Sequence, residues 1–289
     1  MPSFTRLLFV SFLLWATMPA TARAAQDAAA TPAPMRVLFV GNSLTYTNNL
    51  PRLVRAVAAS QSGGPAIETA TYAIPGADLD ELWDDGHAAA ALREGKWDVV
   101  VLQERGGLFS CIAGSTRDPE CRRSESAHRR FTELATEAGA RVMLLMTWPP
   151  MRGNDLGDAS RLRRRAERLN TVYEDTARRW SRGGADVSVV PAAAALYRFA
   201  GGRASEEVLV DGVHPSVQAS LLMAAQLYRA ITGHVAQPAD LLIDFPLLPA
   251  NAMVLADAPL ESQAQIAGDG SKVLLKSGAV EAVYAAAAE

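Results

Sequence analysis

The chain has 289 residues, of which 49% are hydrophobic and 20% charged, and its formal net charge at pH 7 is -3. A weakly acidic chain lacks the strongly basic face that phosphate binding needs, which argues against nucleic acid as the main partner. The length and the hydrophobic content are sufficient for a large core and favour one to two globular domains.

The first 24 residues have the pattern of a secretory signal peptide. Arg6 precedes an apolar run from Leu7 to Met18, and small residues follow up to Ala24. We therefore expect cleavage after Ala24, a linker over residues 25–34, and an exported protein that is periplasmic or secreted. The apolar run is short for a membrane span, and no later stretch is long and apolar enough, so we expect no stable membrane insertion after cleavage.

Strand and helix patterns alternate from residue 35 to residue 234. Five short apolar runs predict buried strands, and the segments between them carry hydrophobic residues at helical spacing. The predicted strands are Val37–Val40, Ile67–Ile74, Trp97–Glu104, Val142–Thr147 and Val187–Val190. The predicted helices are Leu53–Ser60, Leu79–Trp83, Ser124–Ala138, Ala159–Arg182, Pro191–Ala200 and Ser216–Ile231. This order predicts an α/β domain with a central parallel sheet of about five strands and helices on both faces.

Three further segments have local explanations. In the arginine-rich run Arg161–Arg165, Leu162 begins a helical hydrophobic pattern, so we expect the arginines on the solvated face. Cys111 and Cys121 predict a structural disulfide worth roughly 3 kcal/mol, and without a nearby histidine pair they do not favour a metal site. Residues 235–289 lose the alternation, and we interpret them as an appendage that packs on the domain or is partly disordered.

The candidate nucleophile is Ser43, which follows the first predicted strand in the run Gly41-Asn42-Ser43. A serine hydroxyl needs a base to take its proton and donors to stabilise the oxyanion. Asp211 and His214 lie three residues apart on a late loop, where a carboxylate can orient an imidazole toward a serine. Either motif alone is more often structural, but the chain offers no rival nucleophile. The combination predicts a catalytic triad at the carboxyl edge of the sheet, where ligands bind in parallel sheets.

These residues resemble blocks I, II and V of the SGNH (GDSL-type) hydrolases. The resemblance rests on Gly41-Asn42-Ser43-Leu44 after the first strand, Gly76 after the second, and Asp211-x-x-His214 before the last helix, and it covers roughly residues 35–233. It implies a flavodoxin-like three-layer α/β/α sandwich and hydrolysis of esters or thioesters, without a cofactor or a metal. It also implies Ser43 as nucleophile, His214 as base and Asp211 as its orienting partner.

The sequence departs from the family at block III, where an asparagine side chain would complete the oxyanion hole. Here Gln103 stands at the end of the third strand, and its side chain carries the same amide group as asparagine on one additional methylene. Asn154 resembles the missing motif in letters but follows the fourth strand. We therefore expect the oxyanion donors to be the backbone N–H groups of Ser43 and Gly76 and the side chain of Gln103, with Asn154 as the alternative.

The resulting hypothesis is an exported serine esterase that removes small acyl groups, such as acetyl, from carbohydrate. Its expected partner is a small-molecule or glycan ester. The alternatives are a lipase- or thioesterase-type acyl hydrolase, an acyltransferase that uses the same acyl-enzyme, and a catalytically silent carbohydrate-binding or cell-envelope protein. The last alternative follows from the altered block III.

Overall fold

The computed structural model describes residues 33–289 except 113–117, 152–154, 265, 267–269 and 271. The predicted signal peptide, most of the predicted linker and Asn154 lie outside this part of the chain. Within it, five strands form one parallel sheet in the order β2-β1-β3-β4-β5. The strands are β1 (Met35–Gly41), β2 (Ile67–Ala73), β3 (Val99–Leu102), β4 (Arg141–Leu145) and β5 (Val187–Val190). This is the flavodoxin-like strand order, so the predicted fold class is confirmed.

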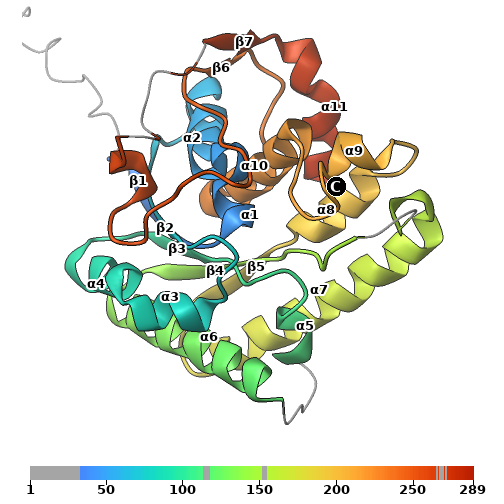
Figure 1. The fold of residues 1–289 in the computed structure, drawn as a ribbon. Helices are drawn as coiled ribbons and strands as arrows, with labels where there is room; N and C mark the ends of the chain where they lie inside the picture. Colours follow the sequence, from blue (N-terminus) through green and yellow to red (C-terminus); the bar gives the residue numbers. More distant parts are fainter. Residues whose placement is uncertain (1–32, 113–117, 152–154, 265, 267–269, 271) are drawn as a thin grey trace, which may run out of the picture. The chain divides into compact units, whose positions relative to one another are not determined.

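Helices cover both faces of this sheet (Figure 1). One layer holds α2 (Leu50–Ser60), α8 (Ala192–Phe199) and α10 (Val217–Thr232), and α10 packs against the other two. The other layer holds α3 (Leu79–Asp85), α4 (His87–Glu94) and α6 (Pro119–Glu137), while α7 (Ala159–Ser181) packs against β5 and α8. The short helices are α1 (Ser43–Tyr46), α5 (Phe109–Ile112) and α9 (Ser205–Val208), with 3-10 turns at Thr47–Asn49, Asp155–Gly157 and Leu260–Ser262.

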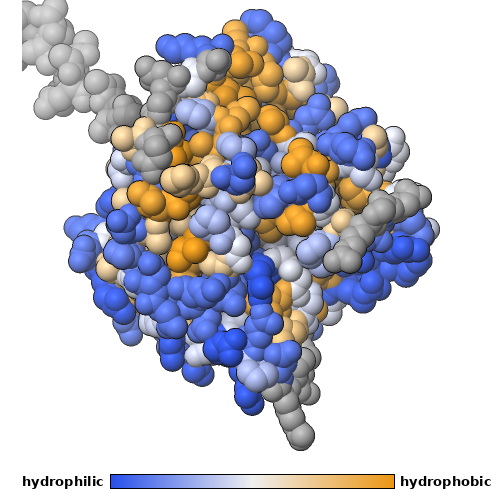
Figure 2. Space-filling view, viewed as in Figure 1, coloured by the Kyte–Doolittle hydropathy of each residue, from blue (hydrophilic) through white to orange (hydrophobic). Residues whose placement is uncertain are grey.

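The core lies between the sheet and these layers. The residues Val99–Leu102 of β3 are at most 1% exposed, as expected for a parallel strand that is covered on both faces. On α7, Leu162 and Leu169 are buried, and three of the four arginines in the run 161–165 are exposed, as expected. Arg165 is the exception, because it is half-buried and donates to Met151 Sδ at 2.7 Å. Figure 2 shows that hydrophilic side chains dominate the visible surface over α3, α4 and α6.

Several described parts of residues 235–289 pack on the domain, among them the 3-10 turn Leu260–Ser262, which contacts β2. Strands β6 (Leu241–Ile243) and β7 (Val273–Leu275) form a separate antiparallel pair, and β6 contacts α2. Helix α11 (Ser277–Ala288) packs on α10 and α8, with Val280 and Val283 buried in the main core. The low-complexity alanine run at the end of the sequence is therefore helical, because its apolar side chains meet a partner surface.

Helix α6 corrects the interpretation of the sequence in three respects. It begins at Pro119, with Asp118 as N-cap accepting from Glu120 N, five residues before the predicted start. The helical spacing of Ala127, Phe131 and Leu134 predicts that Ala138 faces inward, but Ala138 is exposed at the C-terminal end of the helix. His128 stands beside charged residues, which predicts a surface position, but it is 1% exposed. Proline at the first helical turn and an aspartate cap are a common start signal, which explains the longer helix.

Candidate active site

The nucleophile candidate lies where β1 passes into α1. Asn42 caps this short helix, and its side-chain oxygen accepts a hydrogen bond from Leu44 N at 3.1 Å. Ser43 is the first residue of the helix and is partly exposed, while its neighbours Asn42 and Leu44 are buried. The apolar strand ends in a polar cap, and the hydroxyl of Ser43 is therefore presented at the carboxyl edge of the sheet.

The side chain of Gln103 is hydrogen-bonded to the turn that carries Ser43. Its side-chain oxygen accepts from Asn42 N at 2.8 Å and from the hydroxyl of Thr45 at 2.9 Å, and its amide nitrogen donates to Glu104 O at 2.6 Å. The two donors that face the oxygen determine the orientation of the amide. A Cβ on Gly41 would lie 2.3 Å from Thr45 Oγ1 and 2.6 Å from Gln103 Oε1, so only glycine fits there.

These contacts give Gln103 a positioning role beneath the turn. The side chain is 1% exposed, and one of its two amide hydrogens is used inside the protein. Its role as an oxyanion donor stays a prediction that depends on the second amide hydrogen. The alternative donor, Asn154, lies outside the described residues.

Asp211 and His214 complete a chain of hydrogen bonds to Ser43. His214 Nε2 lies 2.8 Å from Ser43 Oγ, and His214 Nδ1 lies 2.7 Å from Asp211 Oδ2. The other carboxylate oxygen, Asp211 Oδ1, accepts from His214 N at 2.7 Å and from Val213 N at 2.9 Å. The carboxylate therefore fixes both the loop backbone and the ring, and it favours the tautomer with the proton on Nδ1.

The electrostatics of Asp211 suit an orienting carboxylate. Burial pushes the pKa of Asp211 up, but the hydrogen bonds from His214 N, the His214 ring and Val213 N together hold it below its usual value. The carboxylate is 49% exposed and the ring of His214 is 17% exposed. Asp211 is therefore ionised at neutral pH, and solvent can reach the pair.

Two distant side chains hold the loop that carries His214. Asn48, which has a φ of 55°, donates from Nδ2 to Pro215 O and to Ser220 Oγ, both at 2.9 Å. Trp148, which is 1% exposed, donates from Nε1 to Val213 O at 2.9 Å. From its place just after the fourth predicted strand, the sequence is compatible with Trp148 in a ligand-binding wall or in the core. The structure shows that it packs in the core and anchors the loop.

Gly76 lies in the turn after β2, beside the nucleophile. Ile74 N donates to Gly41 O at 3.2 Å, and Asn42 Nδ2 donates to Ala77 O at 2.7 Å, so the turn is tied directly to the nucleophile segment. Gly76 has a φ of 73°, which favours glycine. Within the described part of the chain, neither Ser43 N–H nor Gly76 N–H has a hydrogen-bond partner, which leaves both able to bind a substrate oxygen.

Sequence reasoning missed a buried carboxylate next to this site. Glu104 directly follows Gln103 and is 1% exposed, although the usual environment of a carboxylate is solvent. Its side chain lies 3.6 Å from the ring of His128 on α6. Two signals in the sequence pointed to it: Glu104 follows the most apolar strand, and His128 shares the helical face of Ala127 and Phe131.

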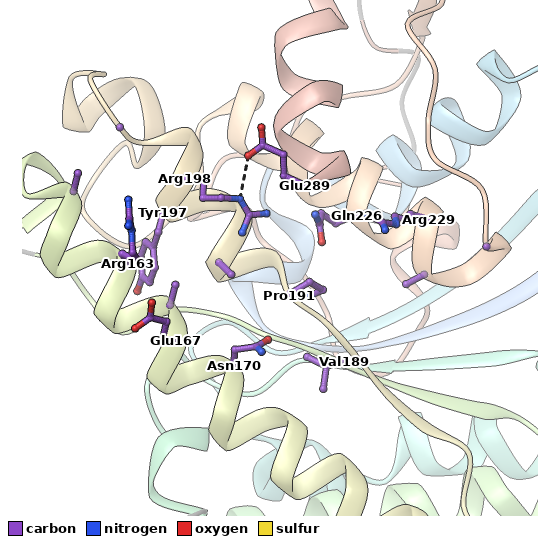
Figure 3. A pocket seen from close by; sticks show the side chains of 16 residues that line it. Arg163, Glu167, Asn170, Val189, Pro191, Tyr197, Arg198, Gln226, Arg229 and Glu289 are labelled. Atoms are coloured by element: carbon purple, nitrogen blue, oxygen red, sulfur yellow. Dashed lines mark ion pairs between the residues drawn. The ribbon is translucent and has the colours of Figure 1, made fainter.

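A cavity lies away from these residues. It has a volume of about 990 Å³ and lies beside β5 and between α7, α8 and α10 (Figure 3). Arg163, Arg198 and Arg229 line it, and Arg198 is paired with Glu289 at 3.6 Å. The lining of this cavity includes no residue of the Ser43 site.

Other observations bear on the setting of the site. Cys111 and Cys121 form a disulfide, as predicted. Among the described residues, no group of three or more His, Cys, Asp or Glu side chains is placed to hold a metal ion. No described helix has the length and apolar character to cross a membrane.

Comparison with known proteins gives structural similarity at low identity. No family model matches the chain, and no curated protein matches it significantly. A DUF4886 family protein from Bacteroides uniformis is 13% identical with a TM-score of 0.48, over 88% of this chain and 93% of that one. A catalytic mutant of Axe2, an acetylxylan esterase from Geobacillus stearothermophilus, is 14% identical with a TM-score of 0.46, over 68% and 94%. TesA is 19% identical with a TM-score of 0.45, over 68% and 98%.

The assignment of the fold therefore rests on this chain's own topology. The described residues have the flavodoxin-like sheet that the resemblance to SGNH hydrolases implies, and the matching residues of blocks I, II and V, which are Ser43, Gly76, Asp211 and His214, come together at one edge of that sheet.

Proposed function

We propose that this chain is an exported serine esterase that forms an acyl-enzyme on Ser43. The observation that carries the proposal is the continuous hydrogen-bonded chain from Ser43 Oγ through the ring of His214 to Asp211. A nucleophile bonded to a base that a third group orients is the arrangement that activates a serine. The disulfide between Cys111 and Cys121 supports an oxidising compartment and hence export.

The reaction follows from the roles of these groups. His214 Nε2 takes the proton of Ser43 as Oγ attacks the ester carbonyl, and Asp211 stabilises the imidazolium that forms. The free N–H groups of Ser43 and Gly76 hold the oxyanion, with the second amide hydrogen of Gln103 as the third donor. The imidazolium then protonates the leaving alcohol, and water, activated by the same ring, hydrolyses the acyl-enzyme.

The substrate class that we propose is an O-acylated carbohydrate with a small acyl group such as acetyl. This choice rests on the polar sequence around Ser43, in which Asn48 is partly exposed while Asn42 and Thr45 are buried. The predicted secretion signal places the enzyme where extracellular glycans occur.

A second candidate is hydrolysis of lipid esters or acyl thioesters. Val210 and Val217 flank the Asp211–His214 pair and are 58% and 39% exposed, so apolar surface borders the site. This surface would suit a longer acyl chain. Rates on p-nitrophenyl acetate and p-nitrophenyl decanoate separate the two candidates, since a clear preference for decanoate would exclude the small-acyl proposal.

The enzyme proposal is tested by the variant Ser43→Ala. We expect a loss of p-nitrophenyl acetate hydrolysis of at least 10³-fold, together with loss of covalent labelling by a fluorophosphonate probe. Ser188→Ala is the matched control, because Ser188 is exposed on β5 and lies outside the site. If the well-folded parent protein shows no labelling that depends on Ser43, the catalytically silent alternative replaces the esterase.

A further inference from the structure

Glu104 is the most deeply buried carboxylate among the described residues next to the proposed site. It lies just past the carboxyl end of β3, and its side chain is 0% exposed. No hydrogen bond joins it to Ser43 or His214. Burial of a carboxylate is unfavourable unless the charge has strong partners, so its position calls for a physical reason.

The carboxylate joins three separate elements. Oε1 accepts from Arg105 N at 2.6 Å and from Leu79 N at 3.3 Å, and Oε2 accepts from the hydroxyl of Ser124 on α6. Leu79 is the first residue of α3 and follows the turn that contains Gly76. The carboxylate therefore fastens the far side of the Gly76 turn to the end of β3.

The main-chain oxygen of Glu104 acts on the nucleophile side. It accepts from Gln103 Nε2 at 2.6 Å and from the hydroxyl of Thr147 at 3.1 Å. The first of these bonds holds the Gln103 amide in the orientation that places its oxygen on Asn42 N and on Thr45. The same residue thus acts on the segment that carries Ser43.

We propose that Glu104 is a positioning residue for the esterase reaction, which sets the Gly76 turn and the Ser43 turn in register with each other. The carboxylate of Glu104 binds the segment after the Gly76 turn, and its main-chain oxygen binds Gln103, which holds the Ser43 turn. Asn42 links the two turns directly through its bond to Ala77 O. Oxyanion donors are effective only at the correct distance from the reacting carbon, so a small shift between the turns lowers turnover. This inference rests on the proposed function.

The surroundings of Glu104 make its charge state sensitive to pH. Burial raises the pKa of Glu104 to about 7, against hydrogen bonds from Ser124 and the backbone that lower it. The groups that face it are His128 on α6, Asp78 at the N-cap of α3, the backbone of Arg105, and Tyr173 on α7. Burial lowers the pKa of His128 to about 4, so the ring is neutral and the carboxylate is held by uncharged donors near pH 7.

The test uses Glu104→Gln in the full chain. Glutamine keeps an oxygen for Leu79 N and Arg105 N, and the hydroxyl of Ser124 can turn to accept from its amide. A neutral acceptor binds these N–H groups less strongly than a carboxylate. We expect kcat on p-nitrophenyl acetate, per site labelled by fluorophosphonate, to fall roughly 3- to 10-fold at pH 8, with KM within about twofold.

Two further readouts separate positioning from general stability. The ratio of wild-type kcat to Glu104→Gln kcat should rise from pH 6 to pH 8, because only the wild type gains a carboxylate there. Amide hydrogen exchange in residues 76–79 should be faster in the variant, which is measurable whether or not the protein is an esterase. Glu125→Gln is the matched control, since Glu125 is an exposed neighbour of Ser124 that pairs with Arg179.

Glu104→Ala should lower kcat further, by about 10²-fold, as expected for displacement of an oxyanion donor. If Glu104→Ala does not fold, the same measurements of kcat per labelled site and of amide exchange on Glu104→Gln and Ser124→Ala test the proposal. A flat kcat ratio across pH together with unchanged exchange would overturn the proposal, as would a loss of folded yield without any loss of kcat per labelled site. Failure of the esterase itself would show separately, as turnover and labelling that do not depend on Ser43.

Discussion

Two carboxylate–histidine pairs lie near the carboxyl edge of the sheet and differ in almost every physical respect. In the Asp211–His214 pair the nearest atoms are 2.7 Å apart, and the side chains are 49% and 17% exposed. In the Glu104–His128 pair they are 3.6 Å apart, and the side chains are 0% and 1% exposed. The first pair faces solvent and a serine hydroxyl, whereas the second is enclosed by protein.

Solvent access and hydrogen bonding explain the opposite electrostatics. At Asp211 the tendency of burial to raise the pKa is outweighed by hydrogen bonds from His214 and Val213, so the pKa is lowered. At Glu104 burial dominates and raises the pKa to about 7, and His128 donates from Nδ1 to Ser124 O at 2.8 Å. A base must accept a proton during turnover, which the exposed pair can do and the buried, neutral ring cannot.

A third pair shows that proximity alone does not make a catalytic site. His87 Nδ1 lies 3.0 Å from Asp85 Oδ2 at the surface, with no serine hydroxyl bonded to its ring. This pair is also exposed to solvent, with the ring 48% and the carboxylate 22% exposed, but it lacks the nucleophile. Asp85 therefore offers a natural control for substitutions at Asp211.

Among substitutions in these three pairs, Asp211→Asn should lower kcat the most. The amide cannot accept the ring proton and both backbone N–H groups as the carboxylate does, so the orientation and tautomer of His214 are lost. We expect kcat on p-nitrophenyl acetate to fall by about 10²–10⁴-fold. Asp85→Asn should leave kcat within twofold, and an equal loss in both variants would show that the two exposed pairs are not distinct.

The two carboxylates should also differ in the sign of their pH effects on folding. The folded-state pKa of Glu104 is raised from 4.5 to about 7. Its contribution to the free energy of unfolding is therefore fully present below pH 4.5 and is lost as the pH rises through 7. Urea unfolding should show the stability of the wild type relative to Glu104→Gln falling by on the order of 3 kcal/mol over this range.

For Asp211 the sign is reversed. Its folded-state pKa is lowered, so its contribution is present above its unfolded-state pKa and is lost as pH falls. The stability of the wild type relative to Asp211→Asn should therefore shrink toward acidic pH, which the same urea titrations measure. Parallel pH trends for the two variants would contradict the contrast between the pairs.

The smallest effect concerns the tie between the nucleophile segment and the exposed pair. Asn48 and Asn49 are adjacent, with φ values of 55° and 56°, but Asn48 binds the His214 loop whereas Asn49 Nδ2 donates to Pro246 O at 3.2 Å. Alanine at either position should cost about 2 kcal/mol in unfolding free energy. Only Asn48→Ala should also lower kcat, by about tenfold, and equal kcat values in the two variants would refute the tie.

Much of the exposed pair was predictable because its contacts are local. The spacing of Asp211 and His214 places the carboxylate beside the ring on one loop, and the apolar run before Gly41 locates Ser43 at a strand end. The disulfide was predictable for the same reason, since Cys111 and Cys121 are close in the sequence. The burial of His128 was also predictable, because His128 shares the helical face of Ala127 and Phe131. The prediction for Ala138 was wrong, because the buried face of α6 does not extend to the end of the helix.

The contact between Glu104 and His128 and the positioning contacts were not predictable, because they join segments far apart in the chain. Whether Gln103 turns its amide oxygen or nitrogen toward Asn42 depends on Glu104 O and Thr45, which no local pattern specifies. The link from Asn48 to Pro215 spans 167 residues.

By itself, the sequence determined the alternation of strands and helices, the place of Ser43 at a strand end, and the pairing of Asp211 with His214, because periodicity and short spacing act over a few residues. Only the tertiary structure decided that His214 reaches Ser43, that Gln103 supports the turn, and that Glu104 is enclosed rather than solvated. Burial and long-range hydrogen bonds arise when distant segments pack, and the packing of α3 and α6 against the end of β3 therefore set the environment of Glu104.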